Sequence, residues 1–139
     1  MKWTAGYDNF SGAYTVRKEV FVKEQKIDEE LELDEYDNIS LHLTIYRNSK
    51  PVATGRLCEH ENSFIIGRVC VLKEYRKMEL GRMLMEKLIE KAISLGAKKL
   101  RLSSQTTAIG FYSRFGFSVC GDTYQDAGIE HISMVRKII

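Results

Sequence analysis

The sequence predicts a single domain of mixed α/β (α+β) structure. Some stretches repeat apolar residues at helical spacing, whereas others alternate apolar and polar residues as strands do. The length of 139 residues matches one ordinary domain. A composition with 44% hydrophobic residues, 29% charged residues and one proline is typical of a globular chain rather than a disordered or fibrous one. We therefore expect one domain over residues 1–139.

The first half of the chain predicts one helix and then three strands. Apolar residues lie at helical spacing between Ser11 and Lys26, and Ser11 can cap the start of this helix. Asp28–Asp37 holds seven acidic residues and no basic one, which predicts a loop or an edge element. Ser40–Arg47 alternates apolar and polar residues, as a half-buried strand does. The two strands that follow at hairpin spacing, Pro51–Cys58 and Phe64–Leu72, complete an expected antiparallel meander.

The second half alternates helices and strands. A stripe formed by Leu80, Leu84 and Leu88 predicts a helix of about four turns, which Gly96 ends. The remaining elements are a strand at Lys98–Ser103, a short helix at Thr107–Arg114 closed by Gly116, and strands near Phe117–Tyr124 and Ile129–Arg136.

Charge, hydropathy and cysteine content exclude several classes of protein. The 21 Lys and Arg residues against 19 Asp and Glu residues leave a net charge of +2, too small for strong nonspecific binding to nucleic acid. No apolar run approaches the ~20 residues of a membrane span, and the start does not resemble a signal peptide, so we expect a cytoplasmic protein without membrane association. Cys58, Cys70 and Cys120 lack metal-ligand spacing, so we expect reduced thiols and no metal.

The stretch Val69–Arg82 joins a buried strand to a helix start through a basic turn. Backbone N–H groups in a first helical turn lack intrahelical partners, and the helix dipole adds roughly half a positive charge there. A phosphate is a natural ligand for such a turn, and Arg76, Lys77 and Arg82 add positive charge. The alternative is an ordinary strand-to-helix turn with solvated basic residues.

Two motifs in this order resemble the GNAT superfamily of acyl-CoA-dependent N-acetyltransferases. Arg76–Gly81 resembles its Arg/Gln-x-x-Gly-x-Gly/Ala loop, which holds the coenzyme A pyrophosphate, and Gln105–Phe117 resembles its Asn-x-x-Ala-x-x-Phe-Tyr-x-x-x-Gly-Phe motif. Three further segments extend the resemblance to the small ElaA-type branch and to nearly the whole chain: Val16–Gln25, Gly55–Leu57 and Gly128–Met134.

The resemblance implies a GNAT fold. Its central sheet is mixed and mostly antiparallel, helices flank it, and a V-shaped split opens between two central parallel strands, here Phe64–Leu72 and Lys98–Ser103. The implied reaction moves an acetyl group from acetyl-CoA, as co-substrate, to an amine of a small molecule or peptide by direct attack in a ternary complex. The chain would act as a monomer or homodimer. The alternatives are a non-catalytic acyl-CoA-binding or protein-interaction module and, last, a small nucleic-acid-binding domain.

The resemblance also implies site residues. Tyr112 holds the position of the acid that protonates the departing thiolate, and a backbone N–H from Val69–Val71 would stabilise the thioester oxygen. The amine proton must pass to a carboxylate, an imidazole or ordered water; the side-chain candidates are His131 and Glu24, with Glu30 and His42 as weaker ones. The full set expected to contact the coenzyme is Val69, Cys70, Val71, Arg76, Lys77, Met78, Glu79, Leu80, Gly81, Arg82, Gln105, Phe111, Tyr112 and Arg114.

Four other features have two readings each. Glu79 stands where the family loop has its first glycine; its carboxylate either repels the pyrophosphate or turns outward toward a basic residue, and we expect the outward orientation. Arg17, Glu24 and Arg56 either form structural ion pairs or line the acceptor pocket. Cys70, among apolar residues, is expected to be buried rather than nucleophilic. The acidic segment Asp28–Asp37 either attracts a cationic acceptor or is a solvated loop.

Overall fold

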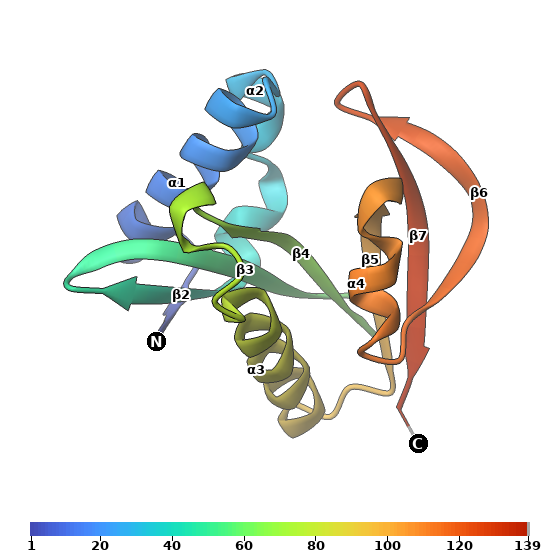
Figure 1. The fold of residues 1–139 in the computed structure, drawn as a ribbon. Helices are drawn as coiled ribbons and strands as arrows, with labels where there is room; N and C mark the ends of the chain where they lie inside the picture. Colours follow the sequence, from blue (N-terminus) through green and yellow to red (C-terminus); the bar gives the residue numbers. More distant parts are fainter. Residues whose placement is uncertain (139) are drawn as a thin grey trace.

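Seven strands form one sheet in the computed structural model, which describes residues 1–138 (Figure 1). Their order across the sheet is β1-β2-β3-β4-β5-β7-β6, and neighbouring strands are antiparallel except β4 and β5. The strands are β1 (Lys2–Ala5), β2 (Leu41–Arg47), β3 (Lys50–His60), β4 (Ser63–Val71), β5 (Lys99–Gln105), β6 (Ser118–Asp126) and β7 (Ile129–Lys137). The expected meander, the parallel pair and the GNAT-type architecture are confirmed.

The parallel pair explains the split in the sheet. β4 and β5 share only three register pairs, from Phe64 opposite Leu100 to Ile66 opposite Leu102. Beyond Ile66 the strands diverge, and in Figure 1 the two halves of the molecule open upward from this junction.

The helical segments lie between these strands. They are α1 (Ser11–Arg17), which continues as the π-helical η1 (Lys18–Glu24), α2 (Glu29–Glu32), α3 (Leu80–Ser94), α4 (Ile109–Ser113), and the short 3₁₀ segments η2 (Glu35–Ile39), η3 (Lys73–Tyr75) and η4 (Thr106–Ala108). The long helix is confirmed at α3, and Gly96 adopts a φ of +90° just beyond it, as a residue that ends a helix often does.

Four expectations about elements need correction. Strand β1 was not predicted, because four residues are too few for an alternating pattern. Ser11 does not cap α1: Phe10 occupies the cap position, and no side chain caps it. The acidic segment is no loop or edge element, since it forms α2 and η2. Strand β2 is buried on both faces, because His42 and Thr44 are covered as fully as Leu43 and Ile45.

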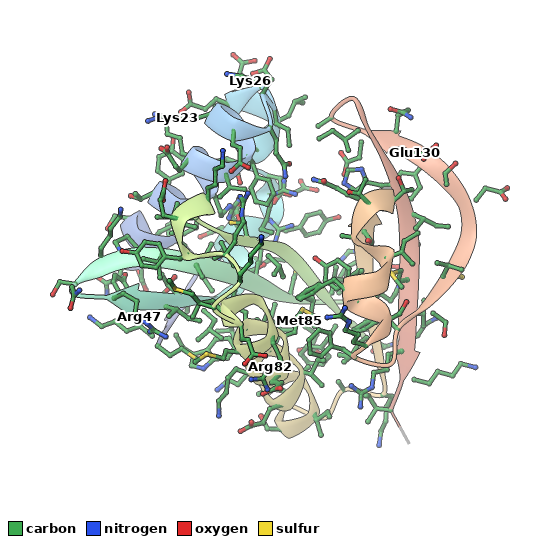
Figure 2. The ribbon with its side chains drawn as sticks, viewed as in Figure 1. Lys23, Lys26, Arg47, Arg82, Met85 and Glu130 are labelled. Atoms are coloured by element: carbon green, nitrogen blue, oxygen red, sulfur yellow. The ribbon has the colours of Figure 1, made fainter. Side chains whose placement is uncertain are left out.

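The main core lies between the sheet and α3. Leu84, Met85 and Leu88 of α3 are fully buried, and Figure 2 labels Met85 where α3 crosses the molecule. Each buried aliphatic side chain of this size contributes about 1.5–3 kcal/mol, so this stripe holds α3 against β3 and β4. Gly55 of β3 allows the close approach, since a Cβ there would lie 2.7 Å from Leu88 Cδ1.

Candidate active site

A cleft of about 920 Å³ lies where β4 and β5 diverge. Its walls come from β4, the turn before α3, α4, the ends of β5 and β7, and the acidic segment. The structure brings every residue expected to contact the coenzyme to this cleft except Met78, an exposed side chain of the turn. His131 also lines the cleft, whereas Glu24 does not.

A bulge in β4 forms one wall of the cleft. Arg56 of β3 pairs with Gly67, but Thr54, two residues earlier, pairs with Cys70, so β4 holds one extra residue there. Arg68 within the bulge has a φ of +51°. Because a bulge leaves ladder groups unpaired and turns the strand, it can present a backbone N–H to the cleft beside Val69.

The turn before α3 has the backbone geometry of an anion site. The first helical hydrogen bond runs from the Met83 N–H to the Glu79 carbonyl at 3.0 Å. The N–H groups of Leu80, Gly81 and Arg82 therefore precede the first helical bond, and all three residues line the cleft. The helix dipole of the 15-residue α3 adds positive potential at the same place.

Gly81 allows a close approach between α3 and α4. A Cβ at Gly81 would lie 3.2 Å from Phe111 Cζ, tighter than ordinary contact. Phe111 in turn packs edge-on against Tyr112, with ring centroids 5.0 Å apart, and against Phe115. Because Gly81 has no side chain, it leaves room for the aromatic group, which includes Tyr112, to pack beside the turn.

The Glu79 side chain has the expected outward character. It is 68% exposed, and its Oε2 accepts a hydrogen bond from Arg82 Nη2 at 2.8 Å. Arg82 also pairs with Glu86, so its charge is shared between two carboxylates; Figure 2 labels Arg82 near the start of α3. The backbone at Glu79 is left-handed, with a φ of +61°, a conformation that glycine adopts more readily than a residue with a side chain.

Arg76, at the cleft wall, forms an ion pair with Glu24, which does not line the cleft. The two Nη atoms of Arg76 donate to the two Oε atoms of Glu24 at 2.7 and 2.6 Å, and Arg76 Nε donates to the Val71 carbonyl at 3.0 Å. The hydrogen bonds from Arg76 lower the pKa of Glu24. A carboxylate held in this way is a weak base, so the geometry argues against Glu24 as the proton acceptor.

Tyr112 and Cys70 lie together in the cleft wall. Burial raises the pKa of Tyr112 to about 12, with a smaller contribution from Cys70, so the phenol keeps its proton at neutral pH. Burial also raises the pKa of the Cys70 thiol, which is 6% exposed. Because the thiolate is the nucleophilic form, Cys70 is unsuited to covalent catalysis.

His131 is oriented by a backbone carbonyl. Its Nδ1 lies 2.7 Å from the Ile129 carbonyl oxygen, which can only accept, so Nδ1 carries the hydrogen and Nε2 of the neutral ring has the lone pair. The ring stacks with Tyr124 at 6.2 Å and lies opposite Gln105 in the β5–β7 register. Gln105 donates from Nε2 to Gln25 Oε1 at 2.9 Å, which joins the two sides of the cleft.

The weaker base candidates lie elsewhere. His42 is 1% exposed, and its Nε2 donates to the Asp37 carbonyl at 3.0 Å; burial lowers the pKa of this imidazole. Glu30 is exposed and does not line the cleft. His42 is therefore a structural histidine.

The acidic segment is bound to three arginines. Arg17 pairs with Glu32 and Asp37 at 2.6 Å each, and all three side chains are buried. Arg56 pairs with Asp34 and Asp37, so the expected structural ion pairs of Arg17, Arg56 and Glu24 are observed, and Arg56 lines the cleft as well. The segment is consequently no solvated loop, because arginines pair with its carboxylates at Glu32, Asp34 and Asp37.

Arg68 and Gln25 are cleft residues that were not singled out. Arg68 pairs with Asp34 and donates to the Glu32 carbonyl. The only local signal for it is the pair Gly67-Arg68, which interrupts an apolar strand and is typical of a bulge. Gln25 belongs to the segment that resembles the ElaA-type branch, but its contact with Gln105 spans 80 residues.

Comparisons with known proteins agree with this geometry. Residues 8–138 match the family model described as "Acetyltransferase (GNAT) domain". The chain is 38% identical over 130 residues to the uncharacterized N-acetyltransferase YjcF of Bacillus subtilis, covering 93% of each chain. It superposes on an acyl-CoA N-acyltransferase from Pseudomonas aeruginosa with a TM-score of 0.86 and 31% identity, covering 98% of this chain and 99% of the other. It superposes on Escherichia coli ElaA with a TM-score of 0.87 and 26% identity, covering 99% of this chain and 100% of the other.

Two further properties concern residues 1–138. None of the helices in this range combines the length and hydropathy that a membrane crossing requires. Over the same range, no three His, Cys, Asp or Glu side chains are grouped so that they could hold a metal ion.

Proposed function

Because the chain belongs to the GNAT acetyltransferase family, we propose that it transfers an acetyl group from acetyl-CoA to the amine of a small molecule or peptide by direct attack in a ternary complex. The observation that carries this is the single cleft that holds the turn before α3, the β4 bulge, Tyr112 and His131 together. We also propose a cytoplasmic location and a monomer or homodimer.

The coenzyme fits the turn before α3. The N–H groups of Leu80, Gly81 and Arg82 would bind the pyrophosphate, and Gly81 leaves room because it has no side chain beside Phe111. Lys77 and Arg114 add charge at the cleft wall. When bound, acetyl-CoA supplies an activated acetyl thioester and a thiolate leaving group.

Three groups of the chain divide the catalytic work. A backbone N–H at the β4 bulge, in Val69–Val71, would stabilise negative charge that develops on the thioester oxygen. His131 Nε2 would accept the proton that the attacking amine loses. Tyr112, which keeps its proton because burial raises its pKa to about 12, would donate that proton to the sulfur.

A two-part experiment tests the proposal. Calorimetric titration with acetyl-CoA measures binding, and thiol release from the same preparation measures transfer to a panel of amines. We expect saturable binding with one site per chain and amine-dependent thiol release. The absence of both would overturn the proposal, and binding without thiol release with any amine would support a non-catalytic acyl-CoA-binding module.

Replacing Tyr112 tests its role separately. Tyr112→Phe removes one hydroxyl from the cleft and should slow transfer by about 10²–10⁴-fold, with acetyl-CoA affinity within about twofold of the wild type. Tyr7→Phe is the matched control, because Tyr7 is 52% exposed and does not line the cleft. Equal rates for the wild type and Tyr112→Phe would exclude the phenol as the acid.

A further inference from the structure

The β4 bulge holds a charged residue at the cleft wall. Arg68 adopts a φ of +51° within a strand, a left-handed conformation that is unfavourable for a residue with a side chain. Bulges beside functional sites re-aim side chains, and Arg68 lines the cleft with 25% of its side chain exposed. The strained backbone therefore places a guanidinium group where a straight strand would not.

A second guanidinium group lies beside the first. One carboxylate joins them: Asp34 Oδ1 accepts from Arg56 Nη1 at 2.8 Å, and Asp34 Oδ2 accepts from Arg68 Nη2 at 3.2 Å. Further bonds hold each arginine, from Arg56 to Asp37 and from Arg68 to the Glu32 carbonyl. Both are thus preorganised before any ligand arrives.

Each arginine retains donors without a partner. Within residues 1–138, no side-chain or backbone oxygen is hydrogen-bonded to Nε or Nη2 of Arg56 or to Nη1 of Arg68. Nη2 and Nε of Arg56 lie over Gly67, 3.6 and 3.8 Å from the place of a Cβ, and Gly67 itself lines the cleft. The Arg56 side chain is nonetheless 91% covered, since its relative exposure is 9%. Such a fork matches the two oxygens of a carboxylate or phosphate.

More positively than negatively charged side chains line this wall of the cleft. Arg56, Arg68 and Asp34 line the cleft, whereas the carboxylates of Glu32 and Asp37 lie behind them and do not. The cleft therefore meets two guanidinium groups and one shared carboxylate at this wall, while Asp37 and Glu32 pair with Arg56 and Arg68 from behind. Burial lowers the pKa of Arg68, and the nearby charges of Arg56 and Arg17 add to the effect, which together outweigh the opposing influence of Asp34 and Glu32.

The wall belongs to the part of the cleft away from the coenzyme turn. Its arginines are held by the α2–η2 segment, and Figure 1 shows α2 at the top of the view and α3 at the bottom, with β4 between them. A ligand group bound by Arg56 and Arg68 would then belong to the acceptor rather than to the coenzyme phosphates.

We propose that Arg56 and Arg68 together bind an anionic group of the acceptor, a carboxylate or a phosphate carried by the same molecule as the reacting amine. This rests on the proposed function. It replaces the alternative in which the acidic segment attracts a cationic acceptor: the segment's carboxylates position two arginines that select an anion.

The test compares amines that differ in one group. The neutral amine is ethanolamine, and the amine with a phosphate is 2-aminoethyl phosphate. The amines with a carboxylate are the ω-amino acids from glycine to 4-aminobutyrate, which vary the distance between the two groups. We expect kcat/KM for at least one anionic arm to exceed that for ethanolamine by about tenfold or more, as a bidentate arginine contact provides. Whichever arm responds identifies the group. Equal or better use of ethanolamine would overturn the proposal.

Variants assign the preference to the arginine. Arg68→Gln should reduce the preference to about twofold through KM, with acetyl-CoA affinity unchanged, and Arg68→Lys should retain part of it because the charge stays and the fork is lost. Arg47→Gln is the control, since Arg47 lies at the far end of the β2–β3 hairpin (Figure 2). A preference that survives in Arg68→Gln would contradict the assignment.

A binding measurement separates this proposal from acetyl transfer. Malonate and inorganic phosphate should raise the melting temperature of the wild type, and less so that of Arg68→Gln, whether or not any amine is acetylated. If Arg68→Gln does not fold, competition by malonate against the amine but not against acetyl-CoA in the wild type takes its place. Thiol release with neutral amines and no effect of either anion would sink the anion site and leave acetyl transfer standing.

Discussion

Glu79 has an unfavourable backbone conformation and an exposed side chain. Its φ of +61° lies in the left-handed region, and Lys77 two residues earlier has a φ of +67°. A residue with a Cβ is about 1–2 kcal/mol less stable there than in the right-handed region, whereas glycine adopts either readily. The exposed pair with Arg82 offsets little of this, because surface pairs contribute about 0–1 kcal/mol.

Glu79→Gly should therefore stabilise the protein. We expect a gain of about 0.5–1 kcal/mol in the free energy of unfolding, measured by urea denaturation, and no weakening of acetyl-CoA binding. Glu90→Gly is the matched control, because Glu90 is an exposed residue inside α3 and should lose about 0.5–1 kcal/mol. If both substitutions destabilise equally, the backbone at Glu79 is not strained.

At the scale of single residues, motif positions could be predicted from the sequence and ligand-facing geometry could not. Tyr112 and Gly81 belong to spaced patterns, and both reach the cleft. The cleft position of Arg68 depends on one extra residue in the β3–β4 register, which no local pattern specifies. Glu24, by contrast, lies in a segment with a clear resemblance, yet its partner Arg76 is 52 residues away and keeps it from the cleft.

At the scale of elements, local periodicity predicted most helices and strands, but not the acidic segment. Seven carboxylates in ten residues favour solvent in isolation. The segment folds as α2 and η2 because Arg17 of α1 and Arg56 of β3 bind its buried carboxylates. Those partners are distant in sequence, so the structure of this segment is a tertiary effect.

The buried charge cluster should make the fold acid-sensitive. Burial is the largest single influence on Asp37 and raises its pKa, but the hydrogen bonds and charge of Arg17, the Asp34 backbone and the charge of Arg56 together outweigh it and lower the pKa to about 2, from 3.8. A carboxyl with a lowered folded-state pKa stabilises the fold above its unfolded pKa, so this contribution, about 2 kcal/mol, is lost as the pH falls from about 4 to 2. Urea denaturation across this range should show it.

Asp37→Asn isolates that contribution. The substitution leaves Arg17 without one buried partner and should cost about 3–5 kcal/mol at neutral pH, but the loss between about pH 4 and 2 should become smaller than in the wild type. Asp122→Asn, at an exposed position of β6, serves as the control and should change neither quantity. An unchanged acid dependence in Asp37→Asn would assign the sensitivity to other carboxyls.

The pair Glu24–Arg76 links η1 to the coenzyme turn. Since the Arg76 fork is bonded to Glu24 and its Nε to Val71, we expect Arg76 to position the turn rather than neutralise a phosphate. Glu24→Gln and Arg76→Gln should then weaken acetyl-CoA binding by similar factors, up to about fivefold, and the double variant by no more than either. Tighter binding in Glu24→Gln would mean that Glu24 holds Arg76 away from the phosphates.

At the scale of the whole molecule, the order of elements was enough to predict a mixed sheet with one parallel pair. The strand register that opens the cleft could not be predicted, because it depends on where β4 stops pairing with β5. Three residue pairs join the strands at the closed end, and the hydrogen bond between Gln25 and Gln105 joins the two sides at the open end. The aperture of the cleft is thus defined from both ends.

Loss of the hydrogen bond between Gln25 and Gln105 should increase local opening on both sides of the cleft. A neutral side-chain hydrogen bond contributes about 0.5–1.5 kcal/mol, so Gln25→Ala should speed hydrogen exchange about two- to tenfold at the Ile27 amide, which donates to Phe21, and at the end of β5. Thr106→Val is the control, since it removes a bond to Glu130 within the C-terminal half. Exchange that is unchanged in Gln25→Ala, or equally fast in Thr106→Val, would mean that β4 and β5 alone set the aperture.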